Sequence, residues 1–528
     1  MPEIAVPGME PMRPAQRRQD LDFHSILFPE PDAAIKHEAP GFFHDLNLDQ
    51  VVAAITAGRQ DYELAPFFHT PLHELDVIAY RQEVMRELEG ESVLQAVQSF
   101  SSHMRSMREH LVQRDKLIYE NEKARWFLGA VESYCDAVGG LADGLREQVL
   151  EARGLRAFRA YLLAYAESDA FSRLAAETRK LAADLSAIRY CLLIDEDKVT
   201  VRPFEGEADS GAAVEETFQK FRRDALKDYR ATFKDRAGMD HIEAQVLDRV
   251  ALLNPATFGA LDRYCTEHAD YLDGKLADFE REIQFYLAYL AYMETFRRAG
   301  LEFCYPQMSD NSKAVAARNT YDPALAYRLV SANTAVVCND FALRDPERIL
   351  VVSGPNQGGK TTFARMFGVL HYLASLGCPV PGSEARLFLF RQIHTHFERE
   401  EDIRTLRGKL EDDLVRIRRI LQEATPDDVF VINEIFASTS LKDAVDLGKK
   451  IVARISGLDA LCVCVTFLDE LASFNEKTVS MVSTVDPANP ERRTFRLERR
   501  PAEGLAYALA IAERYRVTYA SLKARIAS

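Results

Sequence analysis

Apolar and polar residues recur with different periods along the chain, and these periods divide it into three kinds of stretch. In residues 70–185 and again in residues 214–299, apolar residues return every three or four positions, which predicts long amphipathic helices. Between them, two short apolar runs in residues 188–204 flank a polar D-E-D-K turn, which predicts a β-hairpin. From residue 335 onward, short apolar runs alternate with helical patterns, which predicts an α/β region.

These patterns predict three domains. Residues 1–40 are rich in proline and lack periodicity, so they are expected to form an irregular arm. Residues 41–330 are expected to form a mainly α-helical domain with the short β-hairpin, and residues 331–528 a nucleotide-binding α/β domain. Inside these domains, residues 306–323 are expected to be irregular and residues 335–338 to form a strand.

A glycine-rich stretch, L-V-V-S-G-P-N-Q-G-G-K-T-T in residues 350–362, follows an apolar β-branched run and precedes a helical pattern. It contains G-x-x-x-x-G-K-T, a spacing that lets backbone N–H groups surround a phosphate while the lysine reaches the β- and γ-phosphates and the threonine hydroxyl ligates Mg²⁺. The strand, loop and helix order places a phosphate at a helix N-terminus. The candidate ATP-binding residues are Gly354, Pro355, Asn356, Gln357, Gly358, Gly359, Lys360, Thr361 and Thr362.

A second apolar strand pattern, V-F-V-I in residues 429–432, ends in the polar pair Asn433 and Glu434. At such a strand end the first polar residue supports Mg²⁺ and the second polarises the attacking water. Thr361 and Asn433 are therefore the candidate metal residues, and Glu434 is the candidate catalytic base. Asn433 offers an amide oxygen without a negative charge, which predicts weaker support of the metal than aspartate provides. The alternative for Glu434 is an exposed carboxylate at a strand end.

An amphipathic helix is predicted over residues 406–421, with Leu410, Leu414, Ile417 and Leu421 on one face. Gly408 and Lys409 form a flexible, basic helix start, which suits a phosphate approached from a second subunit. The alternative is an ordinary surface helix. His394 and His396 alternate near a strand and are expected to have structural roles.

Composition and charge narrow the class of protein. Hydrophobic content is 47% and charged content 28%, as in globular proteins that are not membrane-embedded. We find no apolar run long enough for a membrane span and no apolar core of a signal peptide at the N-terminus, so a cytoplasmic protein without membrane partners is expected. The formal net charge of −15 argues against a protein that coats nucleic acid non-specifically.

One segment is basic although the chain as a whole is acidic. Residues 217–236 contain seven lysines and arginines against three aspartates, a local excess of +4, with four aromatic residues among them. Such a segment can follow a DNA backbone. The alternative is a solvated helix face whose aromatic residues pack inward. The DNA-binding candidates are Lys220, Arg222, Arg223, Lys227 and Arg230.

Several of these motifs together resemble the ATPase domain of the MutS family of DNA mismatch repair proteins. The resemblance covers residues 336–528. The stretch S-G-P-N-Q-G-G-K-T-T is similar to the family's T-G-P-N-x-G-G-K-S-T, N-E-I-F-A-S-T-S to its D-E-I-G-R-G-T-S, and V-T-F-L-D-E-L to its A-T-H-Y-x-E-L. Asn339 resembles the family's nucleotide-side loop, and Phe467 falls where the family has a histidine.

The resemblance implies an ABC-type P-loop ATPase domain, preceded by lever- and clamp-like helices, that uses ATP and Mg²⁺. It also implies a homodimer formed through the ATPase domains, in which Gly408 and Lys409 act in trans on the partner's nucleotide. A mismatch-reading domain is not expected, because about 40 irregular residues precede the helical part. The sequence therefore favours an ATP-driven dimeric clamp on DNA, in mismatch repair or a related DNA transaction. The alternative is a nucleotide-gated dimeric scaffold that binds a protein partner, with little hydrolysis and no DNA.

Overall fold

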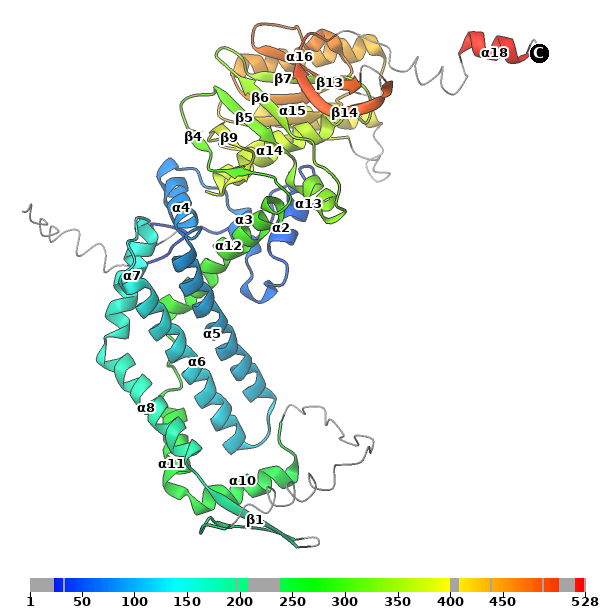
Figure 1. Ribbon diagram of the computed structural model, residues 1–528. Helices are drawn as coiled ribbons and strands as arrows, with labels where there is room; N and C mark the ends of the chain where they lie inside the picture. The colour runs from blue at the N-terminus through cyan, green and yellow to red at the C-terminus, as the bar shows by residue number, and fades with distance from the viewer. Residues whose placement is uncertain are drawn as a thin grey trace, which may run out of the picture. The chain divides into compact units, whose positions relative to one another are not determined.

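A computed structural model of the chain describes most of its residues and divides into two compact units (Figure 1). The helical unit holds Phe23, Leu88–Glu151 and Leu155–Glu280, and the nucleotide unit holds His24–Glu87, Ala152–Gly154 and the chain from Arg281 onward. These units differ from the domains expected at 41–330 and 331–528, because residues 24–87 and 281–330 pack with the nucleotide unit. The described residues are 23–31, 34–195, 198–207, 238–398, 408–436, 439–486, 489–502 and 518–526.

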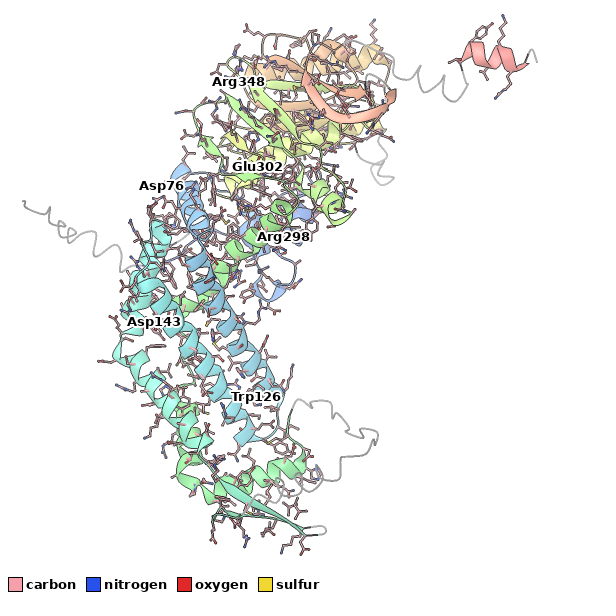
Figure 2. All side chains as sticks on the ribbon, viewed as in Figure 1. Asp76, Trp126, Asp143, Arg298, Glu302 and Arg348 are labelled. Atoms are coloured by element: carbon pink, nitrogen blue, oxygen red, sulfur yellow. The ribbon has the colours of Figure 1, made fainter. Side chains whose placement is uncertain are left out.

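The helical unit is built around two long helices, α5 (Glu91–Lys116) and α6 (Glu120–Arg146). Their apolar residues recur at helical spacing and are buried, which confirms the predicted amphipathic helices. In Figure 2, Trp126 and Asp143 mark α6 among its neighbours. The other elements are α7 (Arg153–Ala166), α8 (Asp169–Ser186), α10 (His241–Leu253), α11 (Pro255–Glu267) and the first part of α12 (Gly274–Arg297).

The predicted β-hairpin is also confirmed. Strands β1 (Tyr190–Asp195) and β2 (Lys198–Pro203) pair antiparallel, with Leu192 opposite Val201. Helix α10 follows, and its first turn is closed by a capping box in which Asp240 and Glu243 satisfy each other's backbone N–H groups.

The nucleotide unit is organised around a six-stranded sheet in the order β10-β11-β12-β7-β13-β14. The first five strands are parallel and β14 is antiparallel. All residues of β7, β11 and β12 are buried, which explains why these strands are continuous apolar runs in the sequence. The bounds are β10 (Ile393–His396), β11 (Val429–Asn433), β12 (Leu461–Val465), β7 (Ile349–Ser353), β13 (Thr478–Asp486) and β14 (Asn489–Arg499).

Three helices belong to the same unit: α14 (Lys360–Ser375), α15 (Lys409–Glu423) and α16 (Leu441–Leu458). The apolar face of α15 packs into the sheet core through Leu410, Leu414, Ile417 and Leu421, as its pattern predicts. Helix α18 (Tyr519–Ile526) is the last described element.

A second sheet, in the order β4-β9-β5-β6, corrects two sequence predictions. Residues 306–323 were expected to be irregular, but they contain two strands, and the strand expected at 335–338 begins instead at Asn339. Both errors have one cause: these strands mix polar and apolar residues and pair with partners far away in the sequence, as β5 does with β9. The bounds are β4 (Gln307–Ser309), β9 (Glu384–Phe388), β5 (Val315–Thr320) and β6 (Asn339–Leu343), and a separate pair joins β3 (Phe303–Cys304) to β8 (Val380–Pro381).

Residues 24–31 pack into the nucleotide unit although they form neither helix nor strand. Ile26 and Leu27 are fully buried. Arg81 on α4 is also fully buried, and its guanidinium donates to the carbonyls of Leu27 (2.9 Å) and Leu376 (3.1 Å). This cation therefore ties the segment to the C-terminal end of α14. The small helices nearby are α2 (Leu48–Ile55), η1 (Gln60–Tyr62), α3 (Ala65–His69), α4 (Leu75–Glu87) and α13 (Pro323–Ser331).

Asp428, directly before β11, gives the fold a measurable dependence on acid. Its carboxylate is fully buried; burial alone raises its pKa, but hydrogen bonds from His394, Arg391 and the Thr425 N–H lower the pKa to about 2. Because this folded-state pKa lies below the unfolded value, the stabilisation is complete above about pH 4 and is lost as pH falls toward 2.

Between pH 4 and pH 2 the unfolding free energy of the wild type falls as Asp428 is protonated. We expect this fall to be about 2 kcal/mol smaller in Asp428→Asn, which has no carboxylate to protonate. Urea unfolding at a series of pH values measures this. The neighbouring Asp427, which is exposed, provides the control Asp427→Asn, whose pH profile should match the wild type. Equal profiles for both variants would contradict the assignment.

Candidate functional site

The glycine-rich loop joins β7 to α14, as its sequence context predicts. Gly354 and Gly359 have φ of +116° and +93°, a region that residues with a Cβ rarely adopt. A Cβ on Gly354 would also lie 2.9 Å from the backbone oxygen of Ser483. Both glycines are thus required by the backbone path. The loop and the first turn of α14 line one cavity, an arrangement that suits a phosphate.

Strand β13 and the edge strand β14 support this loop from the side. The Ser483 hydroxyl donates to the carbonyl of Gly358 at 2.6 Å, and the Arg493 Nε donates to the carbonyl of Asn356 at 3.2 Å. Neither residue was identified from the sequence. Ser483 follows Gly358 by 125 positions, and no local motif marks it.

Lys360 begins α14 and is 4% exposed. Its ammonium donates to the carbonyls of Gly354 and Pro355, each at 3.1 Å, and lies 5.1 Å from the centroid of the Phe467 ring. Burial lowers the pKa of Lys360, and Glu434 partly offsets this effect. The lysine is therefore turned toward its own loop.

The predicted metal residues meet. The Thr361 hydroxyl donates to the Asn433 side-chain oxygen at 2.8 Å, so the ends of α14 and β11 that carry them are in contact. Glu434 follows with a left-handed backbone (φ +54°), and its N–H donates to the carbonyl of Val465 at 2.9 Å. Burial raises the pKa of Glu434, nearby Lys360 lowers it, and Glu398 raises it again.

A cavity of about 570 Å³ lies over these groups. The glycine loop, Thr361, Thr362 and Glu434 line it. A further wall consists of residues from the ends of β5 and β6 and from α13, and it meets the loop at Phe495 of β14, which lies beside Gly359. Asn339 holds this wall, because its side chain donates to the carbonyl of Phe495 (3.1 Å) and accepts from the N–H of Leu497 (2.7 Å). The structure thus brings Asn339 to the same cavity as the glycine loop.

The proposed trans residues lie at the start of α15. Gly408 occupies the N-cap position, with open space where a Cβ would be, and Lys409 forms an ion pair with Glu398 of its own chain. One turn later, Asp413 is buried and its carboxylate lies 3.4 Å from the His396 ring nitrogen. His394 is buried against Asp428. Both histidines thus pair with carboxylates inside the unit.

The DNA-binding candidates cannot be placed in the same way. They lie outside the described residues, in the segment between β2 and α10: Lys220, Arg222, Arg223, Lys227 and Arg230.

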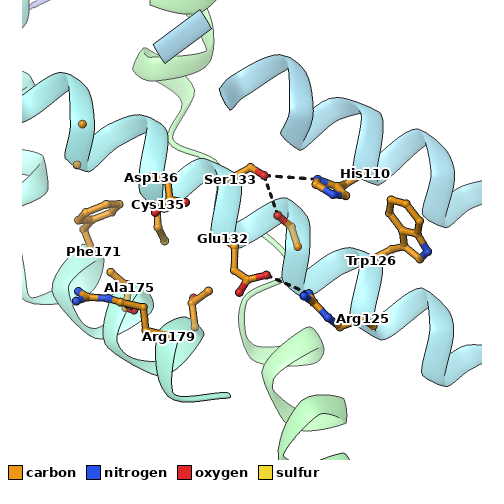
Figure 3. Close-up of a pocket in the computed structure, with 14 residues that line it drawn as sticks. His110, Arg125, Trp126, Glu132, Ser133, Cys135, Asp136, Phe171, Ala175 and Arg179 are labelled. Carbon is orange, nitrogen blue, oxygen red and sulfur yellow. Dashed lines mark hydrogen bonds and ion pairs between the residues drawn. The ribbon is translucent and has the colours of Figure 1, made fainter. Parts of the chain in front are cut away.

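A larger cavity, of about 1000 Å³, lies in the helical unit among α5, α6 and α8 (Figure 3). Two pairs of its lining residues contact each other: Arg125 pairs with Glu132 at 3.0 Å, and the Ser133 hydroxyl lies 3.5 Å from His110. None of the residues predicted for the site lines this cavity. Among the described residues, we find no cluster of three or more histidine, cysteine, aspartate or glutamate side chains suited to a metal, and no helix long and apolar enough to cross a membrane.

A glycine loop between a buried parallel strand and a helix, with a hydroxyl–amide pair and a carboxylate at the same cavity, defines a candidate nucleotide-binding α/β protein. Residues 350–514 match the family model for MutS domain V. This C-terminal part of the chain is therefore similar to MutS domain V and to MutS proteins, which confirms over this part the resemblance found in the sequence.

Three relatives illustrate the match, and each bears the name DNA mismatch repair protein MutS. The protein of Halalkalibacterium halodurans is 29% identical over 174 residues, which is 33% of this chain and 20% of the relative. That of Exiguobacterium sp. is 30% identical over 146 residues (28% and 17%), and that of Petrotoga mobilis 26% identical over 188 residues (35% and 22%). The chain therefore spans about a fifth of the length of the curated relatives it matches.

The contact between Gly358 and Ser483 can be tested by a double-mutant cycle. A Cβ on Gly358 would overlap the Ser483 hydroxyl, with Pro355 O next at 3.0 Å. We expect Gly358→Ala to lower the unfolding free energy by about 1–3 kcal/mol, and the further change Ser483→Ala to recover part of the loss. Urea unfolding measures both.

The control is Gly457→Ala on α16, where a Cβ meets open space. There, alanine should leave stability unchanged or raise it by up to about 1 kcal/mol. No recovery in the double variant would show that the hydroxyl is not the source of the clash.

Proposed function

We propose that the chain is a MutS-like ATP-binding protein with slow ATP hydrolysis that acts as a dimeric clamp on DNA. The observation that carries the proposal is the 2.8 Å contact between Thr361 and Asn433 beside Glu434. It joins two motifs that are about 70 residues apart in the sequence, at the cavity that the glycine loop also lines. Fold and contact together support an ABC-type P-loop ATPase domain.

The triphosphate would bind where the loop N–H groups and the N-terminus of α14 converge. Lys360, whose ammonium donates to the carbonyls of Gly354 and Pro355, would also bind the β- and γ-phosphates. The wall held by Asn339, which includes Phe495, leaves room beside the loop for the rest of the nucleotide.

The side chains at this site fit Mg²⁺. Thr361 and Asn433 place two neutral oxygen atoms together, and Mg²⁺ in nucleotide sites is held by few protein oxygens, with phosphates and water as its other ligands. When bound, the ion would neutralise charge on the phosphate oxygens. Because the pair carries no charge, metal affinity should depend strongly on the bound phosphates.

Glu434 would orient a water molecule against the γ-phosphate and accept its proton. Its raised pKa makes it a stronger base than an exposed glutamate, and it lies close enough to Lys360 for each to shift the other's pKa. Weak support of the metal by Asn433 makes hydrolysis slow, whereas ATP binding depends on the glycine loop and Lys360, which are intact.

The proposal also includes a homodimer and a DNA-binding part. A homodimer through the nucleotide units would bring Gly408 and Lys409 of one subunit to the nucleotide of the other. The helical unit, with its long α5 and α6, would provide the lever- and clamp-like part that meets DNA. The relatives' name, DNA mismatch repair protein MutS, supports a role in mismatch repair or a related DNA transaction, in the cytoplasm.

We expect Glu434→Gln to lower the rate constant of ATP hydrolysis by about 100-fold or more while ATP affinity changes little, since the amide cannot take a proton. Phosphate release measures turnover, and calorimetry measures binding. The exposed Glu476 provides the control Glu476→Gln, with unchanged turnover. Unchanged hydrolysis in Glu434→Gln would show that Glu434 is not the base.

DNA binding is tested with fluorescent matched, mismatched, branched and single-stranded DNA at two salt concentrations, with and without ATP and Mg²⁺. We expect ATP-dependent binding, and we expect alanine at the five basic candidates of residues 217–236 to reduce the salt slope by up to about 4.5, at about 0.9 per phosphate contact. Alanine at the exposed Lys442, Lys450 and Arg454 of α16 is the control. If the wild-type protein binds none of the four kinds of DNA at low salt, the DNA proposal is wrong.

A further inference from the structure

The ammonium of Lys360 is enclosed on two sides. Two of its three N–H donors are taken by the carbonyls of Gly354 and Pro355, at 3.1 Å each. The Phe467 ring lies 5.1 Å away, within the range of a cation–π contact. A phosphate oxygen that binds the lysine therefore competes with these three partners for the ammonium.

Of the three partners, the ring is the easiest to displace. Its backbone is fixed, because the Thr466 N–H donates to the carbonyl of Val352 and the Leu468 N–H donates to the Thr466 hydroxyl, both at 3.0 Å. Thr466 and Leu468 are buried, whereas Phe467 between them is 49% exposed. A side chain that is half exposed on a fixed backbone can rotate into solvent without disturbing the sheet.

The Gly354 and Pro355 carbonyls, by contrast, belong to the loop that would hold the phosphate. They are fixed by the backbone path that requires a left-handed Gly354 and by the Ser483 contact to the same loop. Moving them would rebuild the site itself, while moving the ring leaves the loop intact.

We propose that Phe467 is a removable cap on Lys360: its ring holds the ammonium in the nucleotide-free chain, and an entering phosphate chain displaces it. This inference rests on the proposed nucleotide site. It makes Phe467 a positioning residue, which acts through Lys360 and has no hydrogen-bond donor for the phosphate. The cap is expected to act equally on every ligand that carries a phosphate chain, because it acts on the lysine and not on the base.

The size of the effect follows from the strength of a half-exposed cation–π contact. Losing it should tighten binding by about two- to fivefold. Phe467→Leu removes the ring and keeps an apolar side chain, whereas Phe467→Tyr keeps the ring. The pair therefore separates the aromatic contact from apolar bulk.

The first test does not depend on nucleotide binding. In protein labelled with ¹³C at the lysine ε-carbon, Lys360 should show a ring-current shift, assigned by its loss in Lys360→Arg. The shift should vanish in Phe467→Leu, persist in Phe467→Tyr, and diminish when inorganic pyrophosphate is added to the wild type. A normal Lys360 signal in the wild type, or one unaffected by Phe467→Leu, would overturn the inference.

Calorimetry with ATP and with pyrophosphate is the second test. Phe467→Leu should bind both about two- to fivefold more tightly than the wild type, and Phe467→Tyr should match the wild type. Unchanged or weaker binding by Phe467→Leu would overturn the cap, the latter because the ring would then contact the ligand. If the wild type binds neither ligand, the proposed nucleotide function fails and the cap fails with it, while the ring-current shift still decides whether the ring contacts the lysine.

Discussion

The position of β7 between β12 and β13 is the constraint on which the candidate site depends. All three strands run parallel, with Val352 opposite Val465 and Ser353 opposite Val482. Because parallel strands end at the same edge of a sheet, the glycine loop after β7, the Phe467 turn after β12 and Ser483 of β13 meet there. The neighbouring β11 brings Asn433 and Glu434 to the same edge. A change of register in any of these pairings would separate the groups.

At this edge of the sheet, the groups that contact Lys360 and the candidate metal residues are neutral. Lys360 is held by two carbonyls and an aromatic ring, and the residues that would support a metal, Thr361 and Asn433, are both neutral. Two carboxylates line the cavity: Asp322, which caps α13, and Glu434, whose pKa is shifted by Lys360. A phosphate chain with its counter-ion would thus supply most of the charge of the loaded site. Under the proposed function, ATP binding would depend on the loop and hydrolysis on Glu434, so the two would be separable.

The nucleotide unit also includes residues that precede the strands of its sheet by several hundred positions in the sequence. Arg81 is fully buried, and two carbonyls and the faces of Phe28 and Phe285 compensate the cost of removing its guanidinium from water. A guanidinium suits this position because it is planar and has several donors directed at different segments. Residues 24–87 consequently belong with the sheet, although their helical pattern gives no sign of it.

The sequence by itself determined the glycine loop, the apolar strands β7, β11 and β12, the amphipathic α5, α6 and α15, and the β1–β2 hairpin, because each follows from local backbone preference or from burial with a regular period. It also gave Lys360, Thr361, Asn433 and Glu434 as candidates by their place at strand and loop ends, and their roles stay predictions. The roles of Gly408 and Lys409 in trans and of the basic segment stay predictions, because they depend on a partner or on residues outside the described part of the chain.

Only the tertiary structure decided which way Lys360 points, that Ser483, Arg493 and Phe495 belong to the site, and that residues 307–320 form strands. The physical reason is the same in each case. These features arise from pairing between segments that are distant along the chain, as with Ser483 and Gly358, 125 positions apart, and such pairing leaves no periodic pattern in either partner.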